Sequence, residues 1–295
     1  MPRPGTVTVL LILWISWAGA FASPALARSW AYDVYLPSQY QSSQQNYPVL
    51  YLLHGNNGSR HDWVKLGKIQ ATADALIASG EIPPAIIVMP DAGVTWFVDR
   101  REKMETALIR DLITDVEKNF RALRSRDGRL IGGLSMGGYG SLRFALKYPE
   151  LFAAAALLSP AIYEPVPPKN SGARRVGTFG APDFDEQVWR SLNYPALWEA
   201  YLAKKTPVPM YINSGDDDEF MIEAEATKLY SLLRANQQPA ELRIVNGAHT
   251  WVVWESTIGD AMKYIFRYAA RPSALENLAY AKYTTTPMTF QMKKR

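Results

Sequence analysis

The chain has 295 residues, of which 48% are hydrophobic and 20% are charged. This composition is typical of a globular protein and excludes a disordered, collagen-like or coiled-coil chain. The sequence has no cysteine, which excludes disulfide scaffolds, cysteine-ligated metal sites and cysteine nucleophiles, and its net charge of +4 is too small to indicate a nucleic-acid partner.

The N-terminal segment is predicted to be a signal peptide that covers residues 1–27. Residues 7–22 are almost wholly apolar, Arg3 precedes them, and Ala25-Leu26-Ala27 follows with the small–x–small pattern of a cleavage site. The apolar run is short for a membrane span, which needs about 20 residues. We therefore expect export to the periplasm or the medium, with no membrane span after cleavage. The alternative is an uncleaved N-terminal anchor.

The remaining chain is expected to hold one α/β domain over residues 28–270 and a C-terminal extension over residues 271–295. Continuous apolar runs are typical of strands that are buried on both faces of a parallel sheet. Such runs occur at residues 47–53, 84–89, 129–134, 152–158, 207–212 and, with more alternation, 240–245. Helical patterns occupy residues 105–120, 136–147, 222–235 and 252–269. This alternation predicts a mostly parallel, doubly wound sheet with helices on both faces.

One stretch, residues 162–207, breaks this alternation. It is rich in proline and glycine and contains Trp189 and Trp198. Clusters of proline and glycine interrupt regular structure and favour loops and short elements. We interpret the stretch as a cap-like insertion over one end of the sheet, with short helices and no separate domain.

A candidate nucleophile lies in residues 133–137, whose sequence GLSMG has the pattern G-x-S-x-G. A buried-strand pattern precedes it and a helical pattern follows, which is the context that the nucleophile elbow of a serine hydrolase requires. The glycines allow a sharp turn because they have no Cβ to clash. The turn is expected to present Ser135 near a helix N-terminus, where developing negative charge is favoured.

A serine nucleophile needs a base, and the chain has only three histidines. His249 lies between the last predicted strand and the last long helix, whereas His54 and His61 lie near the start of the domain. In folds with this elbow the order along the chain is Ser, then Asp or Glu, then His, so His249 is the candidate base. The acid is expected just after the strand at 207–212, where residues 216–219 are four consecutive acids. The pattern does not choose among the four.

Two backbone amides are expected to hold the oxyanion of a tetrahedral intermediate. One belongs to Met136, the residue after the nucleophile, and the other to Asn56, in the glycine-rich loop after the strand at 47–53. The candidate residues of a substrate pocket are one histidine of that loop and three tryptophans whose rings suit a sugar or aryl group: His54, Trp63, Trp96 and Trp251. Six tryptophans are candidates for such a platform, and for about half of them packing in the core is the alternative: Trp63, Trp96, Trp189, Trp198, Trp251 and Trp254.

These motifs resemble the putative-esterase family of α/β-hydrolases, which includes esterase D (S-formylglutathione hydrolase), feruloyl esterases, siderophore esterases and the mycolyltransferases. The resemblance is carried by YLLHG at 51–55, PDAG at 90–93, GLSMGG at 133–138, GDDD at 215–218 and GAHTW at 247–251. It implies an α/β-hydrolase fold from about residue 29 to residue 270. Because family members carry G-x-x-D in the acidic tract, it also implies Asp218 as the acid, with Asp217 as the alternative.

The sequence therefore predicts an exported serine esterase that hydrolyses carboxylic esters through an acyl-enzyme. One alternative is acyl transfer to an alcohol by the same residues, and another is a non-catalytic protein that binds carbohydrate or the cell envelope. The sequence has no metal-binding or phosphate-binding motif, so we expect no cofactor. The expected partner is a small-molecule or glycan-linked ester substrate.

Overall fold

The computed structural model describes residues 16–274, which form an eight-stranded sheet in the order β1-β2-β4-β3-β5-β6-β7-β8. Two pairs at one edge, β1 with β2 and β2 with β4, are antiparallel, and all the other pairs are parallel. This is the mostly parallel sheet that the sequence predicts. The strands are β1 (Ser16–Ser23), β2 (Arg28–Tyr35), β3 (Val49–Leu53), β4 (Ile86–Pro90), β5 (Arg129–Leu134), β6 (Ala154–Leu158), β7 (Met210–Gly215) and β8 (Ala240–Val245).

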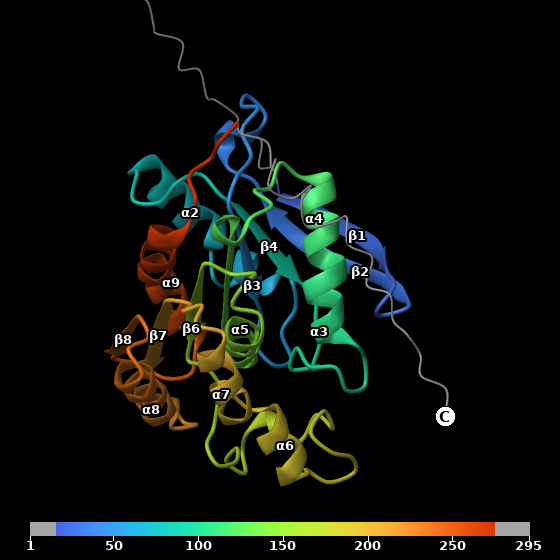
Figure 1. Cartoon of the computed structure of the whole chain (residues 1–295), viewed down its shortest axis with the longest axis vertical. Helices are drawn as coiled ribbons and strands as arrows, with labels where there is room; N and C mark the ends of the chain where they lie inside the picture. The colour runs from blue at the N-terminus through green and yellow to red at the C-terminus, as the bar shows by residue number, and fades with distance from the viewer. Residues whose placement is uncertain (1–15, 275–295) are drawn as a thin grey trace, which may run out of the picture.

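Helices cover both faces of the sheet (Figure 1). They are α1 (Asp62–Lys65), α2 (Ile69–Ala78), α3 (Met104–Thr106), α4 (Ile113–Asn119), α5 (Met136–Lys147), α6 (Glu186–Leu192), α7 (Pro195–Ala203), α8 (Ile222–Ala235) and α9 (Trp251–Ile265). Side chains of α2 and α9 pack on one face, and side chains of α4, α5 and α8 pack on the other. Strand β3 contributes side chains to the apolar layers on both faces. Leu50 and Leu52 belong to the layer under α2 and α9, and Tyr51 and Leu53 to the layer on the other face.

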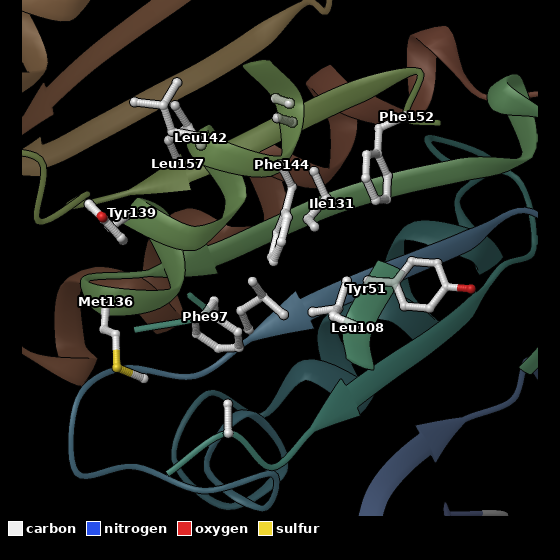
Figure 2. Close-up of a cluster of buried hydrophobic side chains, with 14 of the residues drawn as sticks. Tyr51, Phe97, Leu108, Ile131, Met136, Tyr139, Leu142, Phe144, Phe152 and Leu157 are labelled. Atoms are coloured by element: carbon white, nitrogen blue, oxygen red, sulfur yellow. The ribbon is translucent and has the colours of Figure 1, made fainter. Parts of the chain in front are cut away.

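The larger of the two apolar layers holds α5, the helix that follows the candidate nucleophile, against the sheet. Figure 2 shows Ile131 of β5 and Leu157 of β6 in one cluster with Leu142 and Phe144 of α5, and none of these four side chains is exposed to solvent. Burying a side chain of this size contributes about 1.5–3 kcal/mol. The packing therefore fixes α5 firmly on β5 and β6.

The helical pattern predicted for residues 105–120 corresponds to three consecutive elements. A π-helical turn over Ala107–Leu112 lies between α3 and α4. Leu108 and Val116 are buried on the same side, as their spacing predicts. The hydrophobic pattern specifies the buried face of this segment, but it carries no signal for the change in helical pitch.

The predicted signal peptide overlaps a strand of the sheet. Strand β1 pairs with β2 over its full length, and the Phe21 ring lies 5.9 Å from that of Trp30. The Ser23 hydroxyl donates a hydrogen bond of 2.6 Å to Asp111, and the Ala25 amide donates one of 2.9 Å to the same oxygen. Cleavage after Ala27 removes this strand and leaves β2 at the edge of the sheet. The cleavage stays a prediction, and residues 1–15 lie outside the described residues.

No helix within residues 16–274 is both long and apolar enough to cross a membrane. The first part of the predicted C-terminal extension contacts the domain, because Ser273 and Asn46 exchange two backbone hydrogen bonds. Residues 275–295 lie outside the described residues.

Residues 162–207 contain α6, α7 and a short 3₁₀ turn over Gly172–Arg174. Helices α6 and α7 lie beyond α5, at the lower end of the molecule in Figure 1. The Tyr139 hydroxyl of α5 donates a 2.8 Å hydrogen bond to the carbonyl of Leu192, and the Tyr139 ring stacks on Trp189 at 5.4 Å. These contacts hold the segment against the helix that starts at the candidate nucleophile.

Candidate active site

Ser135 lies in the tight turn between β5 and α5. Its backbone has φ +51° and ψ −114°, a strained conformation for a residue with a side chain. The Ser135 amide donates a 2.9 Å hydrogen bond to the carbonyl of Leu158 in β6, which holds the turn in place. The glycine at 137 is required because a Cβ there would lie 2.5 Å from the carbonyl oxygen of Leu53. The local sequence thus permits a turn that projects Ser135 from the carboxyl end of β5.

His249 connects Ser135 to a buried carboxylate. Its Nε2 lies 2.9 Å from the Ser135 hydroxyl, and its Nδ1 lies 2.7 Å from Oδ2 of Asp218. Asp218 follows β7 and its side chain has 0% exposure, whereas the His249 side chain has 9%. The rings of Phe220 and Trp254 flank the imidazole at 5.0 and 4.9 Å. The three polar residues come from three separate loops and form one hydrogen-bonded chain.

The acidic tract after β7 divides into one buried and three exposed side chains. Asp218 is buried and its Oδ1 accepts a 3.0 Å hydrogen bond from the Phe220 amide, so both its oxygens have donors. Asp216, Asp217 and Glu219 are exposed. Asp216 accepts a hydrogen bond of 2.9 Å from the Gly247 amide, and so ties the loop that carries His249 to the tract. The geometry therefore joins Asp218, and not Asp217, to His249.

The two predicted oxyanion donors lie at the ends of neighbouring strands. Met136 is the first residue of α5, so its amide has no partner within the helix. Asn56 follows β3, which pairs with β5, and it lines the same pocket as Ser135. The close approach of Gly137 to the Leu53 and His54 carbonyls brings the two loops together.

The pocket beside Ser135 has a volume of about 240 Å³. Of the four predicted pocket residues, Trp96 and Trp251 line it. Residues that sequence reasoning did not single out also line it, from the loop after β7 and from the 162–207 segment: Phe220, Tyr163, Ser171, Gly172 and Arg175. No sequence motif includes these positions. They line the pocket because the tertiary fold brings their loops next to Ser135.

His54 and Trp63 do not line this pocket. The buried His54 ring has both nitrogens occupied, since Nε2 accepts a 2.9 Å hydrogen bond from the Ala92 amide and Nδ1 lies 2.7 Å from the Gly55 carbonyl. Burial lowers the pKa of His54. Trp63 has 0% exposure and donates to the Leu53 carbonyl at 3.0 Å. Both residues therefore support the loop after β3 from within the core, which corrects their expected place in the pocket.

Comparison with known proteins identifies the family. The family described as "Putative esterase" matches residues 23–265, which is most of the chain. The chain belongs to this family. The match begins at Ser23, within β1, and so includes the five residues before the predicted cleavage point.

Relatives of this esterase-family chain have names that mention different esters. An esterase of Mycobacterium tuberculosis is 38% identical over 48% of this chain, although the match spans only 31% of that protein. An acetyl esterase of Caldicellulosiruptor saccharolyticus is 28% identical over 75% of this chain and 84% of its own. The solved structure of a ferulic acid esterase has a TM-score of 0.75 at 25% identity, covering 86% of this chain and 98% of the other. The fold is therefore that of the α/β-hydrolases.

Proposed function

We propose that this protein is a carboxylic ester hydrolase in which Ser135, His249 and Asp218 act as a catalytic triad. The observation that carries the proposal is the continuous hydrogen-bonded chain from Ser135 through His249 to Asp218, beside a pocket, in a member of an esterase family. A buried carboxylate that accepts from Nδ1 keeps the proton there and leaves Nε2 free to accept the serine proton.

In the first half-reaction, Oγ of Ser135 attacks the ester carbonyl carbon while Nε2 of His249 takes the hydroxyl proton. The carbonyl oxygen becomes an oxyanion, which the amides of Met136 and Asn56 hold by hydrogen bonds. The carbon–oxygen bond to the alcohol then breaks, His249 gives its proton to the leaving alkoxide, and the acyl group stays on Ser135.

In the second half-reaction, a water molecule gives a proton to Nε2 of His249 and attacks the acyl carbon. The bond from that carbon to Oγ breaks, and the same proton returns to Ser135. The products are one carboxylic acid and one alcohol. Asp218 keeps its charge throughout and stabilises the protonated imidazole.

The direct test replaces the nucleophile Ser135 and, as a matched control, Ser141 in α5, the helix that follows it. Ser135→Ala should lower kcat for 4-nitrophenyl acetate by about 10⁴-fold or more. Ser141→Ala makes the same change where the hydroxyl only donates to the Gly137 carbonyl, and it should retain activity. Full activity of Ser135→Ala refutes the proposal. Adding a sugar acceptor separates hydrolysis from acyl transfer, and we expect the free acid as the main product.

We also propose that the apolar N-terminal segment directs export. The sequence pattern places the cleavage after Ala27, but the pairing of β1 with β2 opposes the loss of residues 16–27 from the folded protein. Mass spectrometry of the exported protein decides this. A new N-terminus at Arg28 supports cleavage, whereas a peptide that spans Ser23 and Arg28 excludes it. Retention of the whole protein in the cytosol refutes export.

A further inference from the structure

Arg175 is a cationic side chain at the candidate active site, and no carboxylate among residues 16–274 pairs with it. It directly follows the 3₁₀ turn Gly172–Arg174, is exposed, and lines the pocket that contains Ser135 and His249. Its Nη2 donates a 3.0 Å hydrogen bond to the carbonyl of Asn170, in its own loop. Within residues 16–274 its guanidinium forms no ion pair and no second hydrogen bond.

The neighbouring charged side chains, unlike Arg175, are held by contacts within the fold. Arg174 donates to the Pro167 carbonyl at 2.7 Å and lies over the Phe184 ring at 4.5 Å. Asp62 is the pocket's carboxylate, and both its oxygens accept hydrogen bonds from Ser59, at 2.9 and 3.0 Å. Arg175 therefore lines the same pocket as Ser135 without pairing with any carboxylate of residues 16–274.

A guanidinium presents a planar set of donors that matches a carboxylate or phosphate and keeps its charge at any physiological pH. Asn56, Asn57 and Ser171 line the same pocket and offer neutral hydrogen-bonding groups, while Phe220 and Trp251 give it an apolar part. The pocket thus suits an ester that has an uncharged portion and an anionic group.

We propose that Arg175 determines substrate specificity by binding an anionic group that the ester carries away from its scissile bond. This inference rests on the proposed esterase function and adds a substrate class to it. Binding of that group would place the ester carbonyl near Ser135 and lower KM for anionic esters relative to neutral esters of the same size.

The test uses two matched substrate pairs, one for each half of the ester. 4-Nitrophenyl hemiglutarate is compared with 4-nitrophenyl pentanoate for the acyl half, and 4-acetoxybenzoate with its methyl ester for the alcohol half. The measured quantity is the ratio of kcat/KM for the anionic ester to kcat/KM for the neutral one. In at least one pair, Arg175→Gln should lower this ratio about tenfold, the lower end for a hydrogen bond to a charged group. Arg175→Lys keeps the charge but not the planar donors, so it should lower the ratio less than Arg175→Gln does.

Arg190→Gln is the matched control, because Arg190 also lies in the 162–207 segment but pairs weakly with Glu186 at 3.9 Å and is absent from the pocket. It should leave both ratios within about twofold of those of the wild-type protein. The advantage of the anionic ester should also fall as salt is raised, because salt screens an exposed charge.

The result that overturns the inference is a pair of ratios that Arg175→Gln leaves unchanged. Calorimetric binding of the same esters to the Ser135→Ala protein gives a second readout that needs no turnover. Weaker binding of the anionic ester after adding Arg175→Gln supports the role of Arg175 even without hydrolysis. Failure of Ser135→Ala to abolish cleavage of the neutral esters instead refutes the esterase mechanism, so the two failures are distinguishable.

Discussion

Asp218→Asn is the substitution that most directly tests the geometry of the site. The carboxylate accepts two hydrogen bonds, from Nδ1 of His249 at 2.7 Å and from the Phe220 amide at 3.0 Å. An asparagine has the same shape but only one oxygen. If that oxygen faces Phe220, the new NH₂ group faces Nδ1 and the imidazole proton must move to Nε2. If it faces His249, two N–H donors face each other at Phe220.

The expected loss of kcat comes from the first of these orientations. A proton on Nε2 points at Ser135 and prevents His249 from accepting the serine proton. Loss of the correct tautomer costs about 10³–10⁴-fold in kcat, which is about 4–5.5 kcal/mol of transition-state stabilisation. In the other orientation the tautomer is kept, but the Phe220 amide loses its acceptor, which lowers the free energy of unfolding by about 1–3 kcal/mol.

Asp217→Asn is the matched control, because Asp217 is adjacent but exposed. Initial rates on 4-nitrophenyl acetate and urea denaturation would be measured for both variants. Asp217→Asn should keep kcat within about twofold, since it removes a solvated charge outside the chain of hydrogen bonds. A large loss in Asp217→Asn together with near-normal activity in Asp218→Asn refutes the assignment of the acid.

Three further predictions concern the fold around the site. Gly137→Ala should lower the free energy of unfolding by about 1–3 kcal/mol, measured by urea denaturation, because its Cβ would lie 2.5 Å from the Leu53 carbonyl oxygen; unchanged stability contradicts this. Burial holds the pKa of His54 below its ordinary value of 6.5. As the pH falls past 6.5, the unfolded chain therefore binds more protons than the folded protein does. The free energy of unfolding should therefore decrease from pH 7.5 to pH 5.5, and by less in His54→Gln; equal decreases would show that His54 does not contribute. A chain that starts at Arg28 should unfold at a lower temperature than one that starts at Ser16, because it lacks β1; equal midpoints would show that the strand adds no stability.

Much of the parallel part of the sheet could be predicted from local sequence patterns. Each of the predicted apolar runs from 47–53 to 207–212 overlaps a strand of the sheet, because a strand covered by helices on both faces is apolar along most of its length. The run at 240–245 alternates more because β8 lies at the edge of the sheet. The antiparallel edge was missed. In β1 the apolar residues also fit the core of a signal peptide, and a linear pattern cannot distinguish a strand from an export signal of similar composition.

The candidate nucleophile and base could be proposed from the chain alone, because short-range constraints specify them. The turn at Ser135 needs glycine at fixed positions, and a chain with three histidines leaves one in the required order. The family resemblance already favoured Asp218 over Asp217, but only the tertiary structure shows the difference in burial and the contact with His249. It also shows that His54 and Trp63 lie in the core and that Arg175 lines the pocket. These placements depend on which segments, distant in the sequence, pack together. A local sequence pattern does not contain that information.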